Sequence, residues 1–194
     1  MKDITDNEMR FVLMIFKSPE TEYNANNIAK HLGISSMGAL KIAKRLEKEG
    51  ILISKELGKA KFYKINLDND YAKHYIKFLL KREAEQASAY VKRWINEIKK
   101  IKNAYSAVLF GSVLKKEKEA NDIDVLLISD GKKFSGLKKE IGEINLLNTK
   151  KLHPLYQAKK DLKENIKKSD KPILNAIKGI VVFGEDNIIE LIEK

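Results

Sequence analysis

Two short motifs in the second half of the chain contain residue types that bind phosphates and divalent cations. The first is Gly111-Ser112, which follows the apolar residues 107–110. The second is Asp122-Ile123-Asp124, which begins after nine intervening residues and opens another apolar stretch. Because alternate side chains of a strand point to the same side, the two aspartates are expected to place their carboxylates together on one face.

The order of these motifs predicts a site for a nucleotide and its metal ion. Gly111 and Ser112 are expected at a helix N-terminus, where free N–H groups and the hydroxyl can hold phosphate oxygens. Carboxylates that are crowded together repel each other, and Mg²⁺ or Mn²⁺ relieves this repulsion while binding the same phosphates. The alternative is that Asp122 and Asp124 open an exposed, solvated strand. The lysines between the motifs are interpreted as a solvated helix face: Lys115, Lys116 and Lys118.

The two motifs together resemble those of the nucleotidyltransferase superfamily that includes DNA polymerase beta, especially its minimal stand-alone members. The matching residues are Phe110-Gly111-Ser112 and Asp122-Ile123-Asp124-Val125, and the resemblance covers residues 104–194. It implies an α/β domain that transfers a nucleoside monophosphate from an NTP with Mg²⁺ or Mn²⁺. In this interpretation Gly111 and Ser112 hold phosphates, while Asp122 and Asp124 are catalytic residues that bind the metal ion.

The chain departs from this family at two places. Many members have a serine directly before the paired aspartates, where this chain has Asn121. The family also places a third carboxylate on a later strand, as the base for the attacking hydroxyl. We predict that strand at residues 143–147, with Glu143 and Asn145 on one face. Either Glu143 is the catalytic base, or Asn145 replaces the base and the domain binds nucleotide without efficient transfer.

The remaining C-terminal residues predict further elements of one α/β domain. We expect helices over residues 152–168, 172–178 and 187–193, and a short strand over residues 180–183 that ends at Gly184. His153 precedes Pro154 and is interpreted as an ordinary surface histidine.

The first 67 residues predict three helices followed by a β-hairpin. Residues 7–17 form the first helix, and Asn24 caps a second over residues 25–31. Gly33 suits the turn after it, and Ser35 caps a third helix that runs to about residue 49. Residues 51–67 predict two strands around a turn at residues 57–60.

This order resembles winged-helix transcription regulators, over about a third of the chain. It implies that the third helix enters the major groove of double-stranded DNA and that the hairpin lies near the backbone. The alternatives are a protein-docking module and a merely solvated helix face. The residues expected at the DNA are Ser35, Ser36, Met37, Lys41, Lys44, Arg45, Lys59 and Lys61.

Residues 71–102 contain neither proline nor glycine and predict one long helix, or two helices with a bend near residues 83–88. We therefore expect an α+β protein with a winged helix-turn-helix at 1–67, a linking or dimerisation helix at 68–102, and a nucleotidyltransferase-like α/β domain with a small mixed sheet at 103–194.

The composition of the chain limits the partners and metal sites that can be expected. The chain has no cysteine, and its three histidines are far apart in sequence, so disulfides and a structural zinc site are excluded. No signal peptide or membrane span is expected, which favours the cytoplasm. The net charge of +11 favours DNA or nucleotides as partners, unless it is only a lysine-rich bias. Two further functions stay open: a regulator that only senses nucleotide, and an antitoxin-like module that pairs with a small helical protein. A homodimer is a further expectation.

Overall fold

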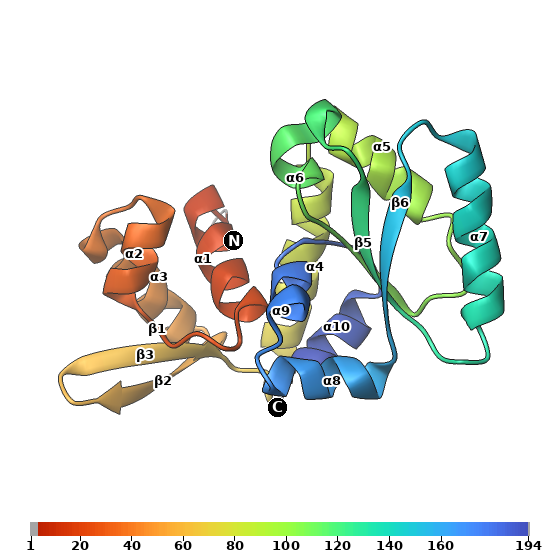
Figure 1. Cartoon of the computed structure of the whole chain (residues 1–194). Helices are drawn as coiled ribbons and strands as arrows, with labels where there is room; N and C mark the ends of the chain where they lie inside the picture. The colour runs from red at the N-terminus through yellow and green to blue at the C-terminus, as the bar shows by residue number, and fades with distance from the viewer. Residues whose placement is uncertain (1–3, 194) are drawn as a thin grey trace. The chain divides into compact units, whose positions relative to one another are not determined.

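The computed structural model describes residues 4–193, and the chain divides into two compact units, Met1–Leu79 and Leu80–Lys194 (Figure 1). The first is a winged helix-turn-helix and the second an α/β domain with a small mixed sheet, so the expected fold class is confirmed. Within residues 4–193, none of the helices combines the length and apolar character that crossing a bilayer requires.

The N-terminal unit contains three helices, a three-stranded sheet in the order β1-β3-β2, and the first part of a fourth helix that begins at Asp70. The strands β2 and β3 form the predicted hairpin, and the two-residue strand β1 adds to the other edge of β3. Its elements are α1 (Asp6–Lys17), β1 (Tyr23–Asn24), α2 (Ala25–Leu32), α3 (Ser36–Lys48), β2 (Leu52–Leu57) and β3 (Ala60–Ile65).

Local side-chain hydrogen bonds fix the ends of α2 and α3. The Asn24 side chain accepts hydrogen bonds from the backbone N–H groups of Asn26 and Asn27, which would otherwise lack partners at the helix start. Gly33 ends α2 with a φ of 70°, a left-handed conformation that favours glycine. Ser35 then caps α3 by accepting a hydrogen bond from the Gly38 N–H at 3.0 Å. The predicted caps and turn are thereby confirmed.

The stretch between the hairpin and the second sheet contains two helices, α4 (Asp70–Glu85) and α5 (Ala89–Ile98), with Ser88 capping the second. Of the two predicted alternatives, one long helix or two helices with a bend, the second is therefore correct. Val91, Trp94 and Ile98 of α5 are buried in the core of the C-terminal unit. A role for residues 68–102 in dimerisation stays a prediction.

The C-terminal unit is built on a four-stranded sheet in the order β6-β5-β4-β7. Strands β5 and β6 run parallel, whereas β4 is antiparallel to both β5 and β7. The sheet positions the site, because β4, β5 and β6 each end or begin at it. The elements are β4 (Ser106–Phe110), α6 (Val113–Lys116), the 3₁₀ turn η1 (Glu117–Glu119), β5 (Ile123–Ile128), α7 (Phe134–Leu147), β6 (Leu152–Gln157), α8 (Lys159–Lys167), α9 (Lys171–Ile177), β7 (Ile180–Phe183) and α10 (Glu185–Ile192).

Two predicted elements are wrong. Residues 143–147 are not a strand but the last part of α7, whose buried residues Leu137, Ile141 and Ile144 recur at helical spacing. The predicted helix at residues 152–168 is instead strand β6 followed by α8. Pro154 is tolerated in β6 because this strand lies at the edge of the sheet, where one row of backbone N–H groups has no strand to pair with.

Candidate functional site

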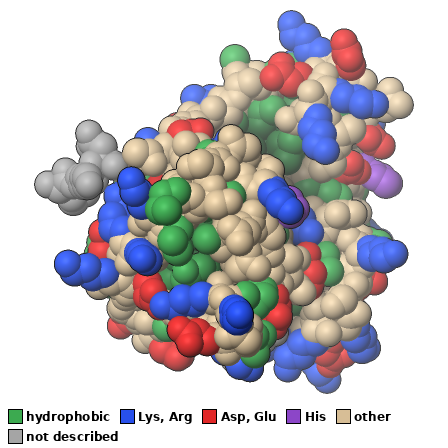
Figure 2. Space-filling model, turned by 90° about the vertical axis from the view of Figure 1, so that its left-hand side faces the viewer, with side chains coloured by type: hydrophobic (Ala, Val, Ile, Leu, Met, Phe, Trp, Pro, Cys, Tyr) green, Lys and Arg blue, Asp and Glu red, His purple; other side chains and the backbone are tan. Residues whose placement is uncertain are grey.

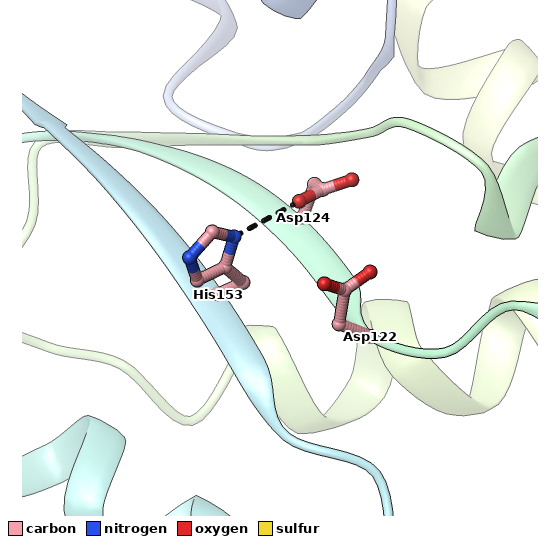
Figure 3. Close-up of side chains that lie close together, drawn as sticks. All are labelled: Asp122, Asp124 and His153. Atoms are coloured by element: carbon pink, nitrogen blue, oxygen red, sulfur yellow. Dashed lines mark hydrogen bonds and ion pairs between the residues drawn. The ribbon is translucent and has the colours of Figure 1, made fainter.

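The paired aspartates lie at the start of β5, and a histidine from the neighbouring strand joins them (Figure 3). Asp124 and His153 are directly paired residues of the parallel strands β5 and β6. The His153 Nδ1 atom lies 3.3 Å from the Asp124 Oδ1 atom. One ligand atom each from Asp122, Asp124 and His153 lies within 4.8 Å of the others. The structure therefore brings together two carboxylates and one imidazole.

Gly111 approaches the same cluster from strand β4. Its predecessor Phe110 is paired with Asp124 across the antiparallel strands β4 and β5, so the chain turns away directly beside the Asp124 carboxylate. Gly111 has a φ of 84°, and a Cβ atom at this position would collide with that carboxylate. Only glycine combines this conformation with this close approach. The two predicted motifs thus meet in space.

Gly111 and Ser112 also open a cleft of about 590 Å³. Ser112 precedes α6, which is only a single turn of helix, so this helix start is shorter than expected. Lysines from two segments far apart in sequence line the cleft, including two that the sequence suggested were a solvated helix face. The lining residues are Phe110, Gly111, Ser112, Leu114, Lys115, Lys116, Asn175, Lys178 and Gly179.

Glu143 and Asn145, the two residues considered for the position of the third carboxylate, lie outside the cluster of Asp122, Asp124 and His153. Glu143 is on the helix α7, where its side chain is 62% exposed and forms an ion pair with Lys139 at 4.0 Å. The Asn145 side chain anchors the start of β6, because it accepts a hydrogen bond from the Leu152 N–H at 2.7 Å and donates one to the Leu152 carbonyl. The prediction that Glu143 lies on a strand is therefore wrong, because residues 143–147 are helical. Its role as the catalytic base stays a prediction.

His153 is the residue that sequence reasoning missed. It lies on β6, the strand that pairs with β5, whereas the third acid was expected on a strand at residues 143–147. Its side chain is 75% exposed, which agrees with a surface histidine, and its Nδ1 atom lies beside the Asp124 carboxylate. The sequence signal for a strand here was weak. It consists of the apolar residues Leu152 and Leu155 on either side of the His153-Pro154 pair, and a proline is compatible with a strand only at a sheet edge or a similar position.

The exposed face of α3 carries most of the residues expected at the DNA. Met37 is 61% exposed, and Ser36, Lys41 and Lys44 are also exposed. Lys59 is exposed at the tip of the hairpin, beside the turn glycine Gly58. Figure 2 shows one face of the molecule, on which lysine and arginine side chains are interspersed with acidic ones.

Three other residues of that set have structural partners instead. Ser35 uses its hydroxyl as the cap of α3. Arg45 forms ion pairs with Glu49 and with Glu8, whose buried carboxylate also accepts a hydrogen bond from the Tyr75 hydroxyl at 2.5 Å. Lys61 binds Glu47 at 2.9 Å.

Glu47 is itself held between two donors. The Ser54 hydroxyl and the Lys61 ammonium both donate to its carboxylate, and these hydrogen bonds hold the pKa of Glu47 below its ordinary value. The carboxylate therefore stays ionised at neutral pH and keeps Lys61 engaged between α3 and the hairpin. Arg45 and Lys61 are thus less available to a ligand than the sequence suggested.

The chain thus combines a winged helix-turn-helix with an α/β domain. In that domain, paired carboxylates lie beside the glycine turn that follows β4. Residues 92–184 match the family described as Polymerase beta, Nucleotidyltransferase, so the C-terminal unit contains a nucleotidyltransferase-like domain. No curated protein matches the chain significantly.

Several solved structures are similar to parts of the chain. One is the homodimeric winged helix-turn-helix DNA-binding domain of a possible ArsR-family regulator from Mycobacterium bovis, with 13% identity, a TM-score of 0.35, and coverage of 43% of this chain and 73% of that one. Another is a transcriptional regulator from Thermotoga maritima, with 19% identity, a TM-score of 0.36 and coverage of 76% and 80%. The adhesin competence repressor of Streptococcus pyogenes has 16% identity, a TM-score of 0.31 and coverage of 51% and 77%. The three helices and the three-stranded sheet of the N-terminal unit themselves define the winged helix-turn-helix.

Proposed function

We propose that the C-terminal unit transfers a nucleoside monophosphate from an NTP to an acceptor hydroxyl and releases pyrophosphate. The observation that carries this proposal is the close approach of Gly111, which also lines the cleft with its lysines, to the Asp124 carboxylate. In the reaction, a bond forms between the acceptor oxygen and the α-phosphorus. The bond from that phosphorus to the oxygen bridging to the β-phosphate breaks, and the hydroxyl proton passes to a base or to water.

The donor set fits a divalent cation, because two carboxylates and an imidazole present ligand atoms within 4.8 Å of one another. Asp122 and Asp124 would hold the ion, and a bound ion would act as a Lewis acid on the phosphates. Gly111 lets the triphosphate approach the aspartates closely, and the Ser112 hydroxyl and nearby N–H groups can donate to phosphate oxygens. Lysines of the cleft offset the negative charge of the nucleotide: Lys115, Lys116 and Lys178.

One observation favours a second candidate, a domain that binds nucleotide as a signal without efficient transfer. The third side chain at the cluster is His153 rather than a carboxylate. A base that removes the proton of the acceptor hydroxyl contributes typically about 10²–10⁴-fold to such a rate. A domain that lacks it would keep nucleotide binding and lose most of the transfer.

Incubation of the full chain with labelled NTPs and Mg²⁺ or Mn²⁺ tests both candidates. We expect labelled product with the wild type and with Asp161→Asn, an aspartate on α8 outside the cluster. Asp122→Asn combined with Asp124→Asn should abolish it. Nucleotide binding without product would favour the sensing function, and the absence of both would refute the whole proposal.

We further propose that the N-terminal unit binds double-stranded DNA, with α3 in the major groove and the hairpin near the backbone, as a transcription regulator does. The exposed residues Ser36, Met37, Lys41 and Lys44 on α3 and Lys59 on the hairpin support this. Lysines and serine contact phosphates or base edges, and Met37 offers an apolar contact to a thymine methyl group. Gel-shift titration with mixed-sequence duplex at low salt tests it, and no shift at any protein concentration would contradict it.

A further inference from the structure

We propose that His153 is itself a ligand of the metal ion, and that it makes the site prefer divalent transition ions such as Mn²⁺ over Mg²⁺. The proposal rests on the proposed nucleotidyltransferase-type site, because it concerns the ion held by Asp122 and Asp124. It goes further by assigning a role to a residue outside the two motifs that the chain shares with the family.

The geometry of the cluster points to His153 as a ligand. Strands β5 and β6 are parallel and pair Asp124 with His153, so both side chains leave the same face of the sheet. The His153 Nδ1 atom faces the Asp124 carboxylate, 3.3 Å from Oδ1 (Figure 3). Adjacent ligands of an octahedral ion with bonds of about 2.1 Å lie about 3 Å apart. A shift of a few tenths of an ångström would therefore let both atoms bind one ion.

The surroundings of the ring leave it free to make this adjustment. The His153 side chain is 75% exposed, whereas that of Asp124 is 24% exposed and is bounded by Gly111. The carboxylate thus has less room to move than the imidazole, which can rotate towards a shared ion. Its strand is also held in register, because Asn145 binds the backbone of Leu152, the residue before it.

The chemistry of the donor set then determines which ion is preferred. Mg²⁺ binds oxygen almost exclusively and retains its waters, whereas imidazole nitrogen favours the first-row transition ions. Two carboxylates and a neutral imidazole carry one negative charge fewer than three carboxylates, which weakens the attraction for a hard cation. The lost charge weakens the attraction for both ions alike, so the preference for Mn²⁺ over Mg²⁺ comes from the imidazole nitrogen.

Electron spin-echo spectroscopy of bound Mn²⁺ tests the ligation directly, because a coordinated imidazole gives a ¹⁴N modulation. Full-length protein is loaded with Mn²⁺ alone and with Mn²⁺ plus tripolyphosphate, which contains no nitrogen, in a buffer without amines. We expect the ¹⁴N modulation in the wild type and in His74→Ala, which removes an exposed histidine of α4. It should disappear in His153→Ala, while Mn²⁺ still binds.

A second measurement tests the preference without relying on activity. Titration of bound Mn²⁺ with Mg²⁺ gives the ratio of the two affinities, and His153→Asp should reduce the preference for Mn²⁺ by about tenfold or more. Bound Mn²⁺ that shows no ¹⁴N modulation, yet is lost in Asp122→Asn, would overturn the role of His153 and leave the proposed function standing. A wild-type preference unchanged in His153→Asp would also overturn it. If neither ion binds at Asp122 and Asp124, with or without tripolyphosphate, both proposals fail together.

Discussion

Gly111 is the residue at which backbone conformation and site chemistry depend most directly on each other. Alanine at this position would have to adopt a φ of 84° and would place its Cβ against the Asp124 carboxylate. The left-handed conformation alone costs a residue with a Cβ atom about 1–2 kcal/mol. The carboxylate would have to move as well, and that movement would disturb the cluster with His153.

We expect Gly111→Ala to abolish the rise in melting temperature that Mn²⁺ and an NTP produce together, because ligand binding to the folded state stabilises it by mass action. Differential scanning fluorimetry measures this shift. Gly131→Ala is the matched control, since a Cβ at Gly131 meets no heavy atom within 4 Å and its φ is not positive. A full ligand-induced shift in Gly111→Ala would show that the ligand does not bind at this turn.

Arg45 and Lys41 lie on the same helix and have different expected roles. Arg45→Ala would leave the buried Glu8 carboxylate with only the Tyr75 hydroxyl as its partner among the contacts described above. We expect it to lower the free energy of unfolding by about 1–3 kcal/mol, the cost of leaving a buried polar group short of a partner. Lys41→Ala should change stability by less than about 0.5 kcal/mol, as exposed substitutions usually do. Urea titration of both variants measures the difference, and equal stabilities would contradict the structural role of Arg45.

Helix α7 is the element whose conformation decides whether Glu143 can serve the site. It contains two glycines in different surroundings. A Cβ at Gly142 would meet open space, whereas a Cβ at Gly136 would lie 2.8 Å from the Asn103 amide nitrogen. That amide is itself held by a hydrogen bond to Glu140 at 2.8 Å, so it cannot move away freely.

Gly142→Ala should therefore raise the free energy of unfolding by about 0.5–1 kcal/mol, because glycine in a helix interior is less favourable than alanine by this amount. Gly136→Ala should gain less or lose stability. Thermal and urea unfolding of the two variants measure the effect. Destabilisation by Gly142→Ala would indicate that this part of α7 is not a regular helix.

At this scale, local signals explain why some elements could be predicted and others could not. Asn24, Gly33 and Ser35 act on residues within a few positions, so the ends of α2 and α3 were visible in the sequence. Residues 143–147 alternate polar and apolar types over a short window, and the helical face appears only when Leu137 and Ile141 are included. Strand β1 has two residues and offers no period at all.

The residues of the candidate site also differ in how well the sequence predicted them. The Gly-Ser turn and the paired aspartates are short motifs, and they could be predicted with their positions. The approach of His153 to Asp124 depends on the pairing of β5 with β6, between residues 29 positions apart. Such a register is set by the burial of a whole sheet face and is not encoded near the residue itself.

Over the whole molecule, the net charge of +11 serves two different kinds of anion in the proposed function. Lys41, Lys44 and Lys59 belong to the N-terminal unit, while the lysines of the cleft belong to the C-terminal unit. Each unit has its own buried core and its own sheet. The two binding activities are therefore expected to be separable by substitution in the full-length chain.

Full-length Lys41→Ala with Lys44→Ala should bind duplex DNA more weakly and keep the shift in melting temperature that Mn²⁺ and an NTP produce. The slope of log affinity against log salt should fall by about 0.9 for each phosphate contact that is lost. Asp122→Asn with Asp124→Asn should show the reverse, with unchanged DNA affinity and no ligand-induced shift. Gel-shift titrations at several salt concentrations and scanning fluorimetry measure the two properties on the same samples. Loss of DNA binding in the aspartate variant, with its fold intact by circular dichroism, would mean that the two activities are coupled and that separate sites are the wrong description.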